Sequence, residues 1–401
     1  MFTHQTFLRP LLRPEQYTSA AQHQLEVERL FRLGWHPVAV ASQLAKPGSF
    51  RTLDLLGTPL LLRNVGGEVR AFLNVCPHRH SRLTHQESGQ SERLKCQYHG
   101  WEFDGAGRTG RIPEAKTFRP WDRGNSCLKT FRVAMWGELI FVSLSEDGPP
   151  HEEFLEPARA LWEGGFSGPF RFASLWAEEF PCNWKVVLEN SLESYHVPQI
   201  HAATLGAIPT EESCSHDLHA GHTSFTTQIR NDLGARLTNG LARRLGAPIT
   251  GKYHHLNVHP HVTFTRLDVY RQVMFLVPTG PQSCRYQSII FSLTGKPYRP
   301  LQWLQAWILR AAVVHFAKKV YAEDGAIFSE VQRGVAASPF PGVIGTREER
   351  IHYFQDYVLR ECGLRTPPDP AEGEANCSNS CASIGCRTHL NDRLNSESCR
   401  Q

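Results

Sequence analysis

The stretch CPHRHSRLTHQESGQSERLKCQYHG, residues 76–100, decides the fold of the N-terminal part of the chain. It contains a C-x-H group, Cys76 and His78, then seventeen residues, and then a C-x-x-H group, Cys96 and His99. Each half offers one thiolate and one imidazole, whereas common zinc fingers pair Cys with Cys and His with His. The mixed pairs therefore favour two facing loops that hold one metal centre between them.

Mixed pairs suit a two-iron cluster with Cys76 and Cys96 on one iron and His78 and His99 on the other, which is Rieske ligation. Neutral imidazoles leave less negative charge on the cluster than thiolates do. They raise its reduction potential to about −150 to +300 mV, from about −400 mV in all-cysteine plant-type clusters. Such a cluster accepts electrons readily from a reductase. A structural zinc site or a chance spacing is the alternative interpretation.

The pattern of apolar residues divides the chain into four segments. Residues 1–34 hold a helical pattern, and residues 35–150 hold short alternating segments, such as 50–55, 60–65 and 139–144, which predict a small antiparallel β domain. Residues 151–365 combine helical candidates at 184–196, 301–333 and 348–360 with β-like segments at 262–276 and 286–293. Residues 366–401 are rich in proline, small and polar residues, and we expect a disordered tail that contains cysteines. The predicted fold class is α+β.

A second group of ligand candidates lies in EFPCNWKVVLENSLESYHVPQIH, residues 179–201. The pattern predicts a strand end followed by a helix, on which spacings of three and four place Glu189, Glu193 and His196 on one face. His201 follows five residues after His196, about 140° round an ideal helix. Pro198 lies between the two histidines, so we expect it to unwind the helix and to let both imidazoles reach one ion.

The third ligand expected at this ion is Asp324, in AKKVYAEDGAIFSEVQRG, residues 317–334. Asp324 falls on a predicted buried helix face, whereas Glu323 points elsewhere. That apolar face consists of Val313, Ala317, Val320, Ile327 and Val331. A buried carboxylate is costly unless it is paired or binds a metal. Two histidines and one carboxylate form the facial triad of non-haem Fe(II) oxygenases, with positions open for O2 and substrate. Glu193 and Asp268 are alternative carboxylates, and purely structural roles in the core are alternatives for Asp324 and for both histidines.

Composition and charge limit the classes of partner. A chain of 401 residues, 41% hydrophobic and 20% charged, predicts a globular protein of two domains. A net charge of +4 without a run of five Lys or Arg residues argues against nucleic acid. We expect no membrane partner, because the apolar stretches are interrupted and too short to span a bilayer. The N-terminus lacks the apolar core of a secretory signal, so we expect the cytoplasm, where the eleven cysteines stay reduced.

With these residues in place, the chain resembles the α subunits of the Rieske oxygenases, also called ring-hydroxylating oxygenases, over about residues 15–360. The Rieske box of the family corresponds to Cys76, His78, Cys96 and His99. Its catalytic box, E/D-N-x-x-E/D-x-Y-H-x4-H, corresponds to Glu189, Asn190, Glu193, Tyr195, His196 and His201. Its late E-D…V-Q-x-G element corresponds to Glu323, Asp324, Val331, Gln332 and Gly334.

The resemblance implies a Rieske 2Fe-2S domain and a larger, helix-grip-like domain that holds mononuclear Fe(II) on an antiparallel sheet packed by helices. It also implies a homotrimer in which the cluster of one subunit reduces the iron of its neighbour. A carboxylate in the position of Glu193 would bridge the two centres through histidines that bind them. Electrons would come from an NAD(P)H-dependent flavin or iron–sulphur reductase, directly or through a ferredoxin.

Two features depart from the family pattern. His80 stands where many relatives have glycine, so an extra imidazole either perturbs the cluster or faces solvent. The tail cysteines have no counterpart that we recognise, and we assign them no function. They are Cys377, Cys381, Cys386 and Cys399.

The predicted function is a terminal oxygenase that uses O2 and reducing equivalents to hydroxylate an organic substrate, either aromatic or quaternary-ammonium. Monooxygenation and dioxygenation are both open. A Rieske electron carrier with an unrelated second domain is the rival, and it would need neither His196 nor His201. The glutamate at 193 is more similar to the branch that acts on choline, glycine betaine and carnitine than to naphthalene-type dioxygenases. A quaternary ammonium group would need an aromatic cage. Tyr253, Phe264 or Phe275 could contribute to such a cage, although each is also a typical sheet-core residue.

Overall fold

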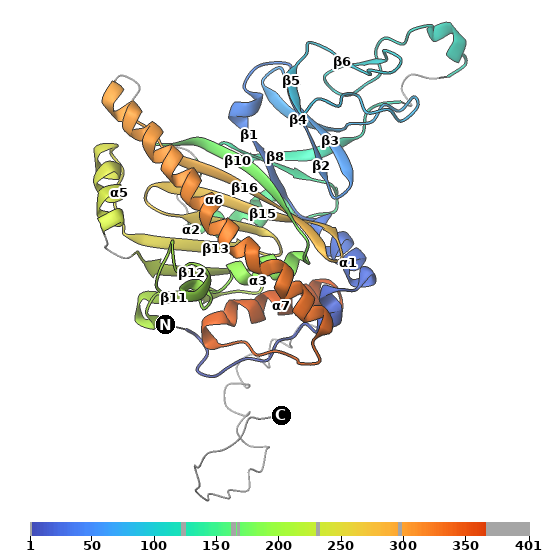
Figure 1. Ribbon diagram of the computed structural model, residues 1–401. Coiled ribbons are helices and arrows are strands. Elements are labelled where there is room, and N and C mark those ends of the chain that lie inside the picture. Colours follow the sequence, from blue (N-terminus) through green and yellow to red (C-terminus); the bar gives the residue numbers. More distant parts are fainter. Residues whose placement is uncertain are drawn as a thin grey trace, which may run out of the picture.

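The computed structural model describes residues 2–121, 126–161, 166, 169–229, 233–295 and 299–365. Figure 1 shows a smaller sheet domain at the upper right and a larger sheet at the lower left, with the long helix α6 running across the larger sheet. All strand pairs in both large sheets are antiparallel, so the predicted α+β class is confirmed. The tail from residue 366 lies outside the described residues. None of the described helices is long and apolar enough to cross a membrane.

The smaller domain contains a seven-stranded sheet in the order β1-β9-β8-β4-β3-β2-β5 and a separate β6–β7 pair. The strands are β1 (His36–Val40), β2 (Ser49–Leu55), β3 (Thr58–Val65), β4 (Glu68–Leu73), β5 (Ser88–Gln90), β6 (Leu94–Lys95), β7 (Glu102–Phe103), β8 (Thr130–Trp136) and β9 (Leu139–Ser143). Cys76 follows β4 and Cys96 follows β6, so two loops at the far tip of this domain carry the first motif (Figure 1).

The larger sheet has the order β10-β16-β15-β14-β13-β12-β11. Its strands are β10 (Phe170–Phe180), β11 (Cys214–Leu218), β12 (His222–Gln228), β13 (Lys252–Val258), β14 (Val262–Arg266), β15 (Tyr270–Gly280) and β16 (Ser283–Leu293). The single β segment predicted at 262–276 is wrong, because β14 and β15 form a hairpin. The Leu267 amide donates to the Tyr270 carbonyl (2.9 Å) and closes the turn.

The two faces of this sheet differ in polarity because side chains alternate along each strand. Phe264 and Phe275 lie on the apolar face, in one core with residues of β1 and β9 of the smaller domain. The opposite face, under the helices, carries residues such as His255, Thr265 and Gln272. Phe264 and Phe275 therefore bury their rings between the domains and cannot contribute to an aromatic cage, whereas Tyr253 shares the polar face with His255.

Seven α-helices complete the described chain. They are α1 (Ala20–Glu26), α2 (His151–Leu161), α3 (Trp184–Ser191), α4 (Val197–Ile200), α5 (Leu233–Arg244), α6 (Pro300–Ala337) and α7 (Glu349–Glu361). Helix α6 buries Val313, Ala317, Asp324 and Phe328 at helical spacing. Val331, which the sequence pattern placed on this face, is exposed and lines a groove, because the buried face at this end of α6 passes through Phe328 and Gln332.

Helix α1 and the turn after it, Val27–Phe31, anchor the N-terminal segment to the larger domain. The Lys185 ammonium of α3 binds both oxygens of Glu26 (2.6 and 2.8 Å), and both side chains are fully buried. The Trp184 indole N–H donates to the same carboxylate (2.7 Å). This buried ion pair fixes the start of α3, the helix that leads into the second group of ligand candidates.

Candidate metal centres

The two loops of the first motif have the same backbone shape. The Cys76 carbonyl accepts from the His80 amide and the Cys96 carbonyl accepts from the Gly100 amide, both at 3.0 Å. His80 and Gly100 both have positive φ, 60° and 72°. That left-handed conformation favours glycine, which accounts for the glycine that many relatives have where His80 stands. The His80 side chain is exposed to solvent.

The four residues of the first motif come together between these loops. The Cys76 and Cys96 thiols are adjacent and buried, while the rings of His78 and His99 lie 4.7 Å apart and partly reach the surface. The His78 Nδ1 atom is buried without a hydrogen-bond partner in the described part of the chain. The His78 ring stacks on Trp101 at 4.7 Å. Two facing thiols and an unpartnered imidazole nitrogen fit a two-iron cluster with its histidine side toward solvent.

The backbone between α3 and α4 differs from the prediction of a helix through His196 that unwinds at Pro198. Helix α3 ends at Ser191, before Glu193, and Pro198 lies in the first turn of α4, where proline is favoured. The Glu193 carboxylate accepts hydrogen bonds from the amides of Tyr195 and His196. A side chain that binds nearby amides competes with the helix for them, so the chain turns before His196.

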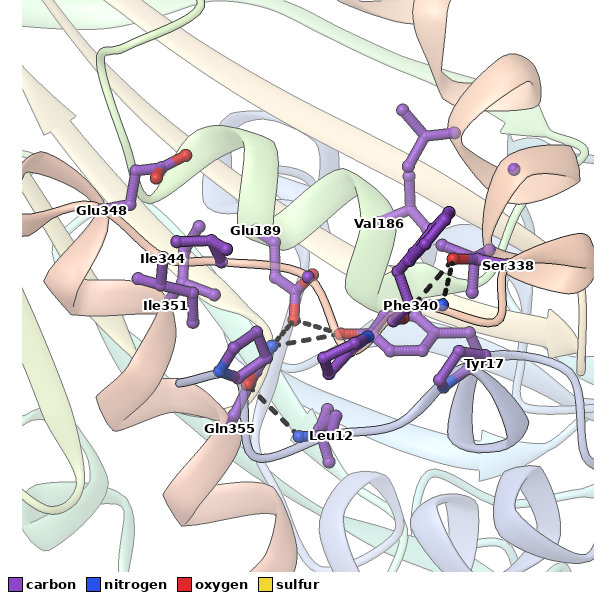
Figure 2. A pocket seen from close by; sticks show the side chains of 18 residues that line it. Leu12, Tyr17, Val186, Glu189, Ser338, Phe340, Ile344, Glu348, Ile351 and Gln355 are labelled. Carbon is purple, nitrogen blue, oxygen red and sulfur yellow. Dashed lines mark hydrogen bonds between the residues drawn. The ribbon is translucent and has the colours of Figure 1, made fainter. Parts of the chain in front are cut away.

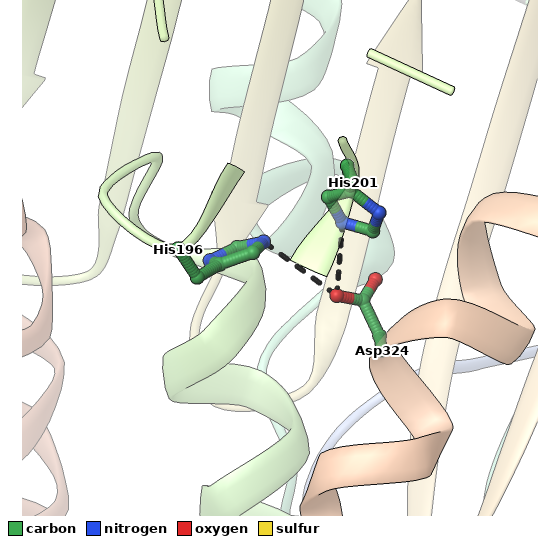
Figure 3. A group of neighbouring side chains, drawn as sticks. All are labelled: His196, His201 and Asp324. Atoms are coloured by element: carbon green, nitrogen blue, oxygen red, sulfur yellow. Dashed lines mark ion pairs between the residues drawn. The ribbon is translucent and has the colours of Figure 1, made fainter. Parts of the chain in front are cut away.

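This turn brings His196 and His201 to Asp324 of α6, as Figure 3 shows. The Asp324 Oδ1 atom lies 3.0 Å from His201 Nε2 and 3.5 Å from His196 Nε2. One ligand atom from each residue lies within 4.8 Å of the other two. Asn190 donates to the same Asp324 oxygen (3.0 Å) and holds the carboxylate in place. The three side chains therefore fit one metal ion.

A carboxylate also binds the far nitrogen of each histidine. Glu193 contacts His196 Nδ1, and Glu323 lies 2.9 Å from His201 Nδ1 and accepts from Thr204 Oγ1 (2.6 Å). Burial alone would lower the pKa of His201, but its contacts with Asp324 and Glu323 raise it. With Nδ1–H donating to a carboxylate, each Nε2 lone pair faces the ion.

The role of Glu323 was not predicted from the sequence. Glu323 lies off the buried face that holds Asp324, as predicted, but the loop after α4 brings His201 and Thr204 to it. The adjacent E-D pair was the only sequence signal for this role. The alternative carboxylate, Asp268, accepts hydrogen bonds from Thr250 and Gly251 instead. These hydrogen bonds do not reach either histidine.

Tyrosines border the space beside the three ligand candidates. Tyr286 and Tyr321 stack at 3.5 Å, and burial raises the pKa of Tyr253 to about 12. The charge of Asp324 contributes to the raised pKa of all three tyrosines. A cavity of about 20 Å³ lies between α3, the polar sheet face and Tyr321. It has room for about one water molecule, and none of the three ligand candidates lines it.

A larger groove of about 490 Å³ lies on the other side of α3, as Figure 2 shows. Its wall includes Glu189, which accepts from Tyr17 (2.7 Å) and Gln355 (2.9 Å). Glu189 therefore does not share a face with Glu193 and His196, because α3 ends between them. Among the described residues that line the groove, the charged ones are Glu189 and Glu348. Burial raises the pKa of Glu348, and the charge of nearby Glu193 adds to this effect.

Known families match both domains. Residues 34–132 match the Rieske [2Fe-2S] domain, and residues 170–363 match the catalytic domain of the ring hydroxylating alpha subunit. The chain thus belongs to the alpha subunits of the Rieske non-haem iron oxygenases. It holds a Rieske cluster and a mononuclear iron. The second match excludes the electron-carrier rival, because a plain carrier has no such catalytic domain.

Individual relatives include enzymes with different substrates. The chain is 24% identical to choline monooxygenase of Arabidopsis thaliana over 84% of this chain and 79% of the relative. It is 30% identical to chlorobenzene dioxygenase subunit alpha of a Cupriavidus species, over 46% of this chain and 42% of the relative. Its fold is similar to that of the quaternary ammonium monooxygenase CntA bound to L-carnitine, with a TM-score of 0.71, 22% identity, and coverage of 88% of this chain and 95% of CntA.

Proposed function

We propose that Cys76, His78, Cys96 and His99 hold the Rieske cluster and that His196, His201 and Asp324 hold the mononuclear iron. The observation that carries this assignment is the convergence of three ligand atoms within 4.8 Å, with a carboxylate behind each imidazole. When bound, the iron supplies an open position at which O2 is reduced. The domain division at about residues 35, 150 and 365 goes with this assignment, since each centre then has its own domain.

We further propose that the substrate is a quaternary ammonium compound. The similarity to choline monooxygenase spans 84% of the chain, whereas that to the chlorobenzene enzyme spans 46%. Tyr321 lies one turn before Asp324 on α6 and stacks with Tyr286, and aromatic ring faces attract an alkylammonium cation. One oxygen atom would enter a C–H bond of the substrate. The other would leave as water, with two electrons and two protons consumed.

The protein side chains would position the iron ligands for this reaction. Glu193 and Glu323 fix the imidazole orientation, Asn190 orients Asp324, and the polar face of the sheet forms the floor of the site.

The proposed assembly is a homotrimer that receives electrons from an NAD(P)H-dependent reductase in the cytoplasm. The groove beside Glu193 supports subunit contact, because the charged residues that line it are acidic, while the cluster loops carry the exposed residues Arg79 and Lys95.

Reconstitution with a reductase, NADH and O2 tests the substrate proposal. Choline, glycine betaine and carnitine should each be compared with benzoate and toluene by O2 uptake and product mass. We expect at least one amine to stimulate O2 uptake and to gain one oxygen atom. Stimulation by aromatic compounds alone would contradict the amine assignment but leave the oxygenase class intact. The variant His196→Ala should abolish either activity, and His85→Ala, an exposed histidine of the cluster domain, is the matched control.

A further inference from the structure

The start of α6 and the neighbouring α5 expose an apolar face that the oxygenase reaction does not use. Trp303 and Trp307 are 61% and 57% exposed and lie one turn apart. We call this surface the α5–α6 face. Its exposed apolar side chains are Leu237, Leu301, Trp303, Leu304, Trp307 and Ile308. Gln302 donates to the Arg244 carbonyl (2.7 Å), so the two helices lie side by side (Figure 1). A contiguous exposed apolar patch of this kind marks an interaction site.

The charges around this face are almost all positive. Between Leu233 and Ala322 the sequence contains one acidic residue, Asp268, and that carboxylate is buried on Thr250 and Gly251. The exposed basic residues on α5 and α6 are Arg236, Arg243, Arg244, Arg310, Lys318 and Lys319. Glu178 and Glu179 approach α6 from β10 only near its middle, and Glu179 is paired with Arg285.

We propose that the α5–α6 face binds the surface of an anionic lipid bilayer, with α6 lying in the plane of the interface. Tryptophans and aliphatic side chains flanked by arginine and lysine form the pattern of an interfacial helix, which enters only the headgroup region. The basic flank complements negatively charged headgroups. A second copy of the chain fits less well, because a two-fold contact would bring Arg243 and Arg244 against their own positive counterparts. The expectation of no membrane partner came from the lack of a spanning segment, and binding to a surface does not need one.

The test is sedimentation of the holoenzyme with lipid vesicles at about physiological salt. We expect binding to phosphatidylcholine vesicles that contain phosphatidylglycerol, and at least about tenfold weaker binding to phosphatidylcholine alone. Trp303→Ala with Trp307→Ala should weaken binding to the anionic vesicles at least about tenfold. Arg243→Glu with Arg244→Glu should weaken it as well, and high salt should have the same effect on the wild-type protein. The cluster absorbance reports folding of each variant.

The matched control is Phe7→Ala, which removes an equally exposed aromatic ring far from this face and should bind as the wild type does. Light scattering of all variants measures the oligomeric state in parallel. The proposal is overturned if the wild-type protein stays in solution with both kinds of vesicle, or if the tryptophan variant binds as tightly as the wild type. A tryptophan variant that changes only the oligomeric state would show that a second copy covers the face. None of these residues touches the iron ligands, so failure here leaves the proposed oxygenase function untouched.

Discussion

At the residue scale, Asp324 is the carboxylate that we propose as the third ligand of the mononuclear iron. It lies within 3.5 Å of both histidine Nε2 atoms, and no other described carboxylate reaches both. We expect Asp324→Ala to lose the mononuclear iron while the cluster spectrum stays intact, because the four cluster residues lie in the other domain. Iron content and visible absorbance of the purified protein measure this. Glu330→Ala, an exposed change two turns along the same helix, should keep both centres, and unchanged iron in Asp324→Ala would show that another carboxylate is the ligand.

His80 gives a second prediction at this scale, about stability. A non-glycine residue with a φ of 60° costs about 1 kcal/mol relative to glycine. The His80 ring is exposed, so its removal should lose no buried contact. We therefore expect His80→Gly to raise the free energy of unfolding by up to about 1 kcal/mol and to leave the cluster potential unchanged. Thermal unfolding and a redox titration measure the two effects, and a shifted potential would mean that the imidazole acts on the cluster.

At the element scale, the buried pair of Glu26 and Lys185 joins α1 to α3. Lys185→Met would leave the Glu26 carboxylate buried without a counter-charge, at a cost of about 3–5 kcal/mol. The double variant Glu26→Gln/Lys185→Met should recover most of this loss, since no buried charge is left. Denaturant unfolding of Glu26→Gln, Lys185→Met and the double variant measures the coupling. If the losses simply add, the pair does not act as a unit.

Glu349 ties three elements together in a way that depends on pH. It accepts from the amides of Thr3 and His4 and contacts His216 of β11 (2.8 Å) from the start of α7. Burial would raise its pKa, but these hydrogen bonds lower it to about 2 from 4.5. A lowered folded-state pKa stabilises the protein above about pH 4.5, and this contribution is lost as the pH falls toward 2.

Glu349→Gln should therefore destabilise the protein at pH 7 by on the order of 3 kcal/mol. The difference between variant and wild type should shrink as the pH falls below about 4.5. Unfolding free energies measured from pH 7 down to about 3 give the profile. Asp217→Asn, an exposed change next to His216 on β11, is the control. A constant difference at every pH would mean that the glutamate acts through its shape and not through its charge.

The elements also show which features the sequence could predict. The sequence predicted candidates for the metal ligands, because these ligands need particular residue types at short spacings. The candidates are the four cluster residues, His196, His201 and Asp324. The turn before His196 was not predicted, because it depends on which amides the Glu193 side chain takes, and helical spacing alone says nothing about this. The role of Glu323 depends on the path of a loop from another segment. Phe264 was ambiguous because an aromatic ring suits a core and a cage equally well, and only the strand register places it.

At the scale of the whole molecule, the separation of the two centres favours electron transfer between subunits. The cluster loops lie at the outer tip of the smaller domain, whereas α3 and the middle of α6 lie on the far side of the larger sheet (Figure 1). The partly exposed rings of His78 and His99 face outward from this tip. Glu193 contacts His196, and its charge raises the pKa of Glu348, which lines the groove beside α3. We propose that a neighbouring cluster approaches the iron from the side of this groove.

Mixed assemblies test this arrangement. His99→Ala should disable the cluster and His196→Ala should disable the iron site, so each protein alone should be inactive. In a cyclic trimer assembled at random from equal amounts of both chains, about one subunit in four has an intact iron site and lies next to a neighbour whose cluster is intact. Purification through both tags keeps only trimers that contain both chains, and each of these has one such subunit in three. We therefore expect co-expressed, doubly tagged trimers to recover about a third of the wild-type rate of substrate-dependent O2 uptake. Electron transfer within one subunit predicts no recovery, because no chain in the mixture carries both centres. Mixing the separately purified trimers without exchange of subunits is the control, and activity there would mean that a diffusing carrier connects them.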